Sequence, residues 1–131
     1  MGASFDNQGD YHAQTADLFY DQPVRGGDGL TLQADYTHYE GGTVFPQLPA
    51  EHTWLAEAGY YFHRPRIGPF LQFTGLRLAS SAGKDQSKYL GGLAWWPQGH
   101  RINVKLGLGR IKSGSDPRRI QAVVQTQFYI Y

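Results

Sequence analysis

The side chains that could act as nucleophiles or general bases are histidines and serines outside the centres of the predicted strands. They are His12, His38, His52, His63 and His100, with Ser80, Ser81, Ser87, Ser113 and Ser115. A hydrolase of the serine type needs a hydroxyl, an imidazole and a carboxylate within hydrogen-bond reach, and strand register brings no such set together. The histidine spacing matches no metal-ligand motif, and the chain has no cysteine. We therefore predict a protein that is not an enzyme and uses no metal or cofactor.

A second set of candidate functional residues is polar and shares one side of the predicted strands. Its members are Asp17, Gln33, Asp35, Glu57, Gln72, Asn103, Lys105 and Gln125. An anion-selective pore needs cationic rings, whereas the charges here are mostly acidic. Because an unpaired enclosed charge is costly, we expect Lys105 to neutralise Glu57 or Asp35. The alternative is a hydrated interior in which these charges never meet.

These side chains are positioned by segments in which polar and apolar residues alternate with period two, the pattern of a β-strand. The expected strands are 2–8, 11–20, 30–37, 52–62, 67–78, 89–96, 101–112 and 120–131. Longer loops follow the third and fifth of these, and short turns follow the fourth and sixth. An even strand number with connections of this kind predicts one domain over residues 1–131, an antiparallel up-and-down barrel.

The opposite side of the strands is apolar and is bounded by aromatic residues. Its centre is formed by Leu32, Ala34, Leu71, Leu93, Val104 and Leu106. The aromatic residues at its two ends are Tyr36, Trp54 and Tyr89 near the longer loops, and Tyr60, Trp95 and Phe128 near the short turns. Ten strand residues tilted near 40° span about 25 Å, the height of the apolar band of a membrane barrel. We therefore predict an all-β fold, an eight-stranded antiparallel transmembrane β-barrel with lipid or detergent outside and two aromatic girdles.

Composition narrows the alternatives. The net charge of +1 argues against nucleic-acid binding. Aromatic residues make up 15% of the chain although its mean hydropathy is −0.48. A chain that is rich in aromatic residues and yet hydrophilic on average is expected when polar and apolar residues alternate along its strands. The sequence contains neither a run of 18 apolar residues nor a signal peptide after Met1, so a mature, truncated or engineered form that is refolded from detergent is expected. A soluble ligand-binding barrel of the lipocalin or avidin kind remains the alternative, although the Gln, Thr and Gly on the polar side are unlike the charged surface of soluble proteins.

Three segments carry a resemblance to a known family. Tyr89-Leu-Gly-Gly-Leu-Ala-Trp-Trp-Pro, then Val104-Lys-Leu-Gly-Leu, then Gln121-Ala-Val-Val-Gln-Thr-Gln with an aromatic end resemble the closing strands of Gram-negative outer-membrane porins. The phosphate-selective porins are the nearest family. The resemblance implies a bacterial outer-membrane barrel with a periplasmic carboxy-terminus, inserted by the outer-membrane assembly machinery.

The chain departs from these porins in two ways. It resembles only their carboxy-terminal half, and Gln125 and Gln127 share the parity of its last residue, where porins carry apolar residues. Because side chains fill an eight-stranded barrel, the predicted function is a passive membrane-spanning barrel with little or no conductance. The sequence leaves open whether two chains associate into a wider barrel.

Overall fold

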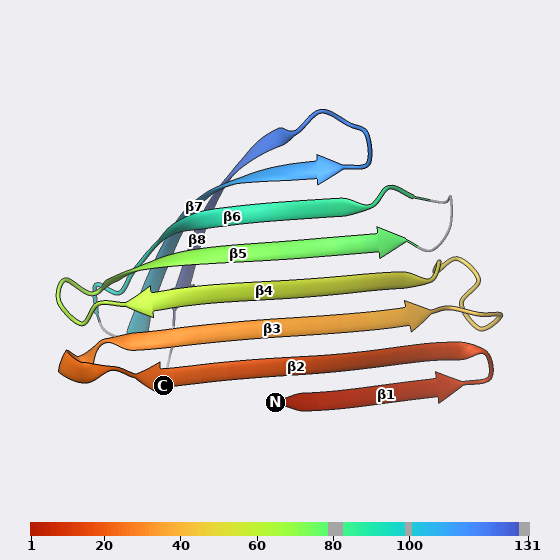
Figure 1. The fold of residues 1–131 in the computed structure, drawn as a ribbon, viewed down its shortest axis with the longest axis horizontal. Helices are drawn as coiled ribbons and strands as arrows, with labels where there is room; N and C mark the ends of the chain where they lie inside the picture. Colours follow the sequence, from red (N-terminus) through yellow and green to blue (C-terminus); the bar gives the residue numbers. More distant parts are fainter. Residues whose placement is uncertain (79–82, 99–100, 129–131) are drawn as a thin grey trace.

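The protein is described by a computed structural model that covers residues 1–78, 83–98 and 101–128. Its strands form one antiparallel sheet in which each strand pairs with its neighbours in chain order (Figure 1). They are β1 (Gly2–Gln8), β2 (Tyr11–Pro23), β3 (Gly29–Glu40), β4 (Glu51–Tyr61), β5 (Ile67–Leu78), β6 (Gln86–Trp95), β7 (Ile102–Ser113) and β8 (Arg119–Phe128). The prediction of eight antiparallel up-and-down strands is therefore confirmed.

Helix is almost absent from the described part of the chain. A 3-10 turn, η1 (Arg25–Gly27), joins β2 to β3. None of the helical structure described is long and apolar enough to cross a membrane.

Strand boundaries differ from the predicted ones where tertiary pairing extends a strand. β2 continues through Pro23, which is opposite Gly29, so the turn shrinks to a loop closed by a 2.8 Å hydrogen bond from Val24 N–H to the Asp28 carbonyl. β6 begins at Gln86, three residues before the predicted start, because Gln86 pairs with both Leu76 and Ser113. The predicted turn at 97–100, the loop at 79–88 and the last strand each include residues outside the described ranges, namely 99–100, 79–82 and 129–131.

The sheet is not closed, so the predicted barrel closure is not confirmed. In the described residues β1 pairs with β2 alone and β8 pairs with β7 alone. β1 covers only Tyr11–Asp17 of the longer β2, so the rest of β2 is also an edge. β7 and β8 turn out of the plane of β1–β5 (Figure 1).

The sheet has two different faces. We call the inner face the one that carries Phe70, Leu90 and Ala94, which are the buried apolar residues of the described chain, and the outer face the opposite one. Trp96 and Val123 pack against this small core. Because Val123 belongs to β8 and Phe70 to β5, the carboxy-terminal strands curl over the inner face.

Glycine permits the close approach of β6 and β7 at this curl. A methyl group on Gly92 would overlap the carbonyl oxygen of Leu106 and would lie 2.7 Å from Gly107 Cα. Both obstacles are backbone atoms, which cannot rotate aside. Gly92 is therefore required by the packing of two neighbouring strands, as glycine often is where backbones approach closely.

Candidate functional site

The polar residues predicted to line an interior all lie on the inner face. Cross-strand partners share a face of a sheet, and the register links Asp17 to Asp35, Gln33 to Glu57 and Glu57 to Gln72. On β7, Lys105 lies opposite Gln125. Asn103, two residues before Lys105 on the same face, is buried. Alternation thus places all eight side chains on the side of the small core.

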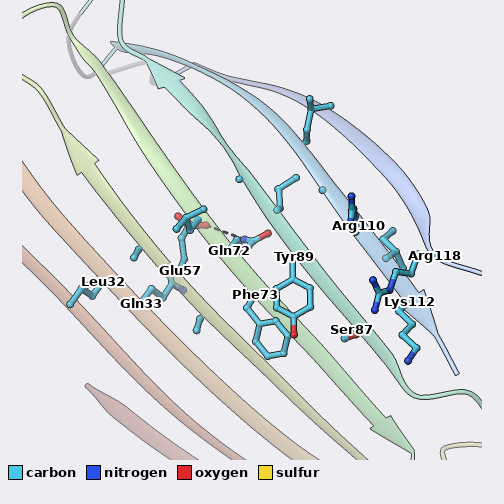
Figure 2. Close-up of a pocket in the computed structure, with 18 residues that line it drawn as sticks. Leu32, Gln33, Glu57, Gln72, Phe73, Ser87, Tyr89, Arg110, Lys112 and Arg118 are labelled. Atoms are coloured by element: carbon cyan, nitrogen blue, oxygen red, sulfur yellow. Dashed lines mark hydrogen bonds between the residues drawn. The ribbon is translucent and has the colours of Figure 1, made fainter.

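An ion pair joins β4 to β7 across this face. Lys105 Nζ lies 3.6 Å from Glu57 Oε1, and the two side chains are 30% and 23% exposed. Gln72 Nε2 donates a 3.0 Å hydrogen bond to the other carboxylate oxygen of Glu57, as drawn in Figure 2. Of the two partners expected for Lys105, the structure shows Glu57, because the curl of the sheet brings β7 over β4 and β5.

Asp35 has a different partner. Its carboxylate accepts a 2.8 Å hydrogen bond from Gln33 Nε2 on the same strand. The ammonium of Lys105 also lies 5.4 Å from the centre of the Phe70 ring, close enough for a favourable cation–π contact. A cavity of about 160 Å³ lies between these groups and is lined in part by Gln72, Lys88 and Gln125. Around Glu57, Gln72 and Lys105 the inner face therefore carries a connected polar network, whereas Asp17 and Gln125 on the same face are exposed.

The ion pair leads to a prediction. Lys105→Leu removes the cation and leaves Glu57 half-enclosed, which should cost roughly 1–2 kcal/mol, between the values for exposed and buried pairs. The measurement is urea unfolding of detergent-refolded protein. Glu57→Gln and the double variant complete a thermodynamic cycle, in which we expect the double variant to be less destabilised than the sum of the single ones. Strict additivity would show that the pair contributes nothing.

The predicted apolar residues all lie on the outer face. Leu32, Ala34, Leu71, Leu93 and Leu106 are exposed there, and Val104 is half-buried. Leu71 is 69% exposed and Leu106 is 55% exposed. Leu108, Ile120 and Val124 are also exposed on this face, where the same alternation places them. The outer face is thus an apolar surface that extends across neighbouring strands.

The six aromatic residues predicted as girdles also lie on the outer face. Tyr36 and Trp54 face each other near the longer loops, and the Tyr36 hydroxyl lies 2.8 Å from His52 Nδ1. Tyr60, Trp95 and Phe128 lie near the opposite ends of their strands. Tyr89 packs against Phe73 at 4.8 Å between ring centres, two residue pairs nearer the middle than Trp54.

Acidic side chains hold the loops outside the strands. Asp10 accepts hydrogen bonds of 2.8 Å from both the backbone N–H and the hydroxyl of Thr43, and these lower the pKa of its carboxyl below the usual 3.8. The ammonium of Lys84 lies 2.6 Å from Asp116 and lowers the pKa of that carboxyl in the same direction. These contacts join the β1–β2 turn to the β3–β4 loop, and the β5–β6 loop to the β7–β8 loop.

Three of the described histidines, His12, His38 and His52, have hydrogen-bond partners at a ring nitrogen. His12 Nδ1 lies 2.8 Å from Asn7 Oδ1, and His38 Nδ1 lies 3.1 Å from the Glu51 carbonyl oxygen. His38 also stacks on His52 at 4.3 Å. Across residues 1–78, 83–98 and 101–128, no group of three His, Cys, Asp or Glu side chains could hold a metal ion. His100 lies outside these ranges.

Comparison of the chain with protein-family models, with curated proteins and with solved structures finds no match. The resemblance to porins therefore rests on the quoted segments alone.

Proposed function

We propose that this protein is a membrane-spanning β-barrel of the bacterial outer membrane, with a polar inner face and an outer face in contact with lipid. The observation that carries the proposal is the sorting of side chains between the two faces. The row of successive cross-strand partners Leu32, Ala58, Leu71, Gly91 and Leu108 is apolar throughout. Monomeric soluble proteins rarely expose a continuous apolar surface of this extent.

The opposite face supports the same proposal. A soluble ligand-binding barrel would enclose its apolar residues and turn its polar ones to water. Here the charged pair Glu57–Lys105 lies on the inner face with the small core, while Leu71 and Leu108 are exposed on the outer face. This arrangement favours lipid over water as the solvent of the apolar face.

A sheet in hydrocarbon must pair the backbone groups of its edge strands. Because the strands alternate in direction and are eight in number, β1 and β8 have opposite directions and can pair with each other. In a wider barrel, β8 of one copy would pair with β1 of a second. Either closure satisfies both edges, and closure is therefore part of the proposal.

The function proposed is passive, with little or no conductance. This proposal is supported by Glu57, Gln72 and Lys105, which fill part of the inner face and line a cavity of about 160 Å³ there. The proposed partners are lipid or detergent and, in a cell, the outer-membrane assembly machinery; nucleic acid and an enzymatic substrate are not among them. The porin resemblance of residues 89–131 agrees with this proposal.

Reconstitution tests the proposal. The protein is refolded in detergent, transferred to phosphatidylcholine vesicles, washed with alkaline carbonate and floated on a density gradient. We expect it to float with the vesicles and to leave planar-bilayer conductance near that of lipid alone. A chain that is monodisperse in buffer without detergent and stays at the bottom of the gradient would contradict a membrane location, and large stable channels would contradict a filled interior.

A further inference from the structure

The outer face carries a groove of about 1110 Å³ (Figure 2). The lining residues of the groove come mostly from the outer-face positions of β3 to β7, including the apolar row from Leu32 to Leu108. Small residues line it at Ala56, Ala58 and Gly91, and the larger Leu71 lies between Ala58 and Gly91. The volume slightly exceeds the range of about 300–1,000 Å³ usual for small-molecule sites. A long, narrow apolar ligand is the kind of molecule that such a groove suits.

One end of the groove is cationic. Arg110 and Lys112 follow Leu108 on the outer face of β7, and Arg118 lies just before β8. In Figure 2 these three side chains lie close to one another beside β7, away from Leu32. The ion pairs of the described residues are Lys84–Asp116 and Lys105–Glu57. Within that part of the chain, no acidic side chain neutralises the three cations.

The cations lie toward the strand ends at the longer loops, where Tyr36 and Trp54 also lie. Lys112 is opposite Ser87, Ser87 is opposite Gly75, and Gly75 is opposite Trp54. Lys112 therefore belongs to the same cross-strand row as Trp54, one of the aromatic residues that would lie at the headgroups. Arg110 is two residue pairs nearer the middle, opposite Tyr89, and its long side chain can extend toward the strand end.

We propose that the groove binds a phosphorylated lipid, with an acyl chain along the apolar row and its phosphate at Arg110, Lys112 and Arg118. Guanidinium groups match phosphate oxygens in bidentate geometry, and an ammonium adds a compact charge. Cations at the edge of hydrocarbon are costly without a partner, and a lipid phosphate supplies one at that depth. This inference rests on the proposed membrane location and adds a specific lipid class to it.

The test is native mass spectrometry of the full chain from detergent micelles that contain equal amounts of phosphatidic acid and phosphatidylcholine. We expect phosphatidic acid to be retained in preference by about tenfold or more, given the attraction of three cations for an anionic headgroup. The triple variant Arg110→Gln, Lys112→Gln, Arg118→Gln should lose the preference. The control triple variant Arg25→Gln, Arg64→Gln, Arg101→Gln removes the same charge elsewhere and should keep it.

Two further measurements distinguish a lipid phosphate from free phosphate, and the apolar part of the groove from its cationic end. Inorganic phosphate at the same concentration should not displace the lipid, and Ala58→Phe, which places a larger side chain in the groove, should weaken retention while leaving the cations in place. Equal retention of both lipids, equal losses in both triple variants, or displacement by inorganic phosphate would each overturn the lipid site. In these cases all variants would still float with vesicles, whereas failure of the unsubstituted chain to float would overturn the membrane location and the lipid site together.

Discussion

Replacing Leu71 by arginine should destabilise the folded protein in a phospholipid bilayer by about 2–4 kcal/mol, the cost of a basic side chain on the lipid face near the midplane. Leu71 lies near the middle of β5, is 69% exposed, and has Ala58 and Gly91 as its cross-strand partners. An exposed leucine on a soluble protein would tolerate the same change within about 0.5 kcal/mol. The measurement is reversible urea unfolding of vesicle-inserted protein.

Gln72→Arg is the matched control, because it places the same side chain at the same depth on the opposite face. Gln72 already donates a hydrogen bond to Glu57, and an arginine there would face a carboxylate rather than acyl chains. We expect a change within about 1 kcal/mol, the range of partly solvated ion pairs. Equal costs at the two positions, or a larger cost at Gln72, would show that the outer face does not meet hydrocarbon.

Replacing Gly92 by alanine should cost about 1–3 kcal/mol, the usual range for overpacking a closely packed site. The added methyl group would meet the Leu106 carbonyl oxygen and Gly107 Cα. Neither can rotate away, so β6 and β7 must separate. The curl that brings Val123 onto the core of Phe70 and Leu90 should loosen with them. Unfolding by urea measures the cost, and near-ultraviolet circular dichroism reports the packing of Trp96 against the same core.

The control for Gly92 is its neighbour on the outer face. A methyl group on Gly91 would lie 3.1 Å from Leu71 Cδ2, the flexible end of a side chain. Gly91→Ala should therefore change stability by no more than about 0.5 kcal/mol, and loss of glycine entropy in the unfolded chain would offset part of any cost. Similar effects at the two glycines would contradict the close approach of β6 and β7.

Period-two alternation was sufficient to predict the strands and the two faces, because each property depends on neighbours in the sequence. The residues at which strands begin and end were harder to predict. Pro23 is typical of a break, yet it closes β2, where its partner Gly29 is the first residue of β3. Gln86 lies in a polar stretch that resembles a loop, and its pairing with Leu76 and Ser113 became visible only in the sheet.

Contacts between distant strands could be predicted only in part. The sequence offered Glu57 and Asp35 equally to Lys105, and the choice depends on how far β7 curls over β4 and β5. Barrel closure likewise depends on the two edge strands and on no local pattern. The groove was missed because Arg110 and Lys112 stand at the end of a strand. The sequence did carry a signal for the groove: Arg110 and Lys112 have the same parity as Leu106 and Leu108, which places both cations on the apolar face.

The central claim is that the outer face meets acyl chains and the inner face does not, and two adjacent tryptophans test it most directly. Trp95 lies on the outer face and is 51% exposed, whereas Trp96 packs against the inner core and contacts Tyr61 edge-on at 4.9 Å between ring centres. Each is made the sole tryptophan, by Trp54→Phe with either Trp96→Phe or Trp95→Phe. The proteins are then inserted into vesicles of a phospholipid brominated on its acyl chains near the headgroup. We predict strong quenching of Trp95 fluorescence and weak quenching of Trp96; equal quenching of the two, or stronger quenching of Trp96, would contradict the account.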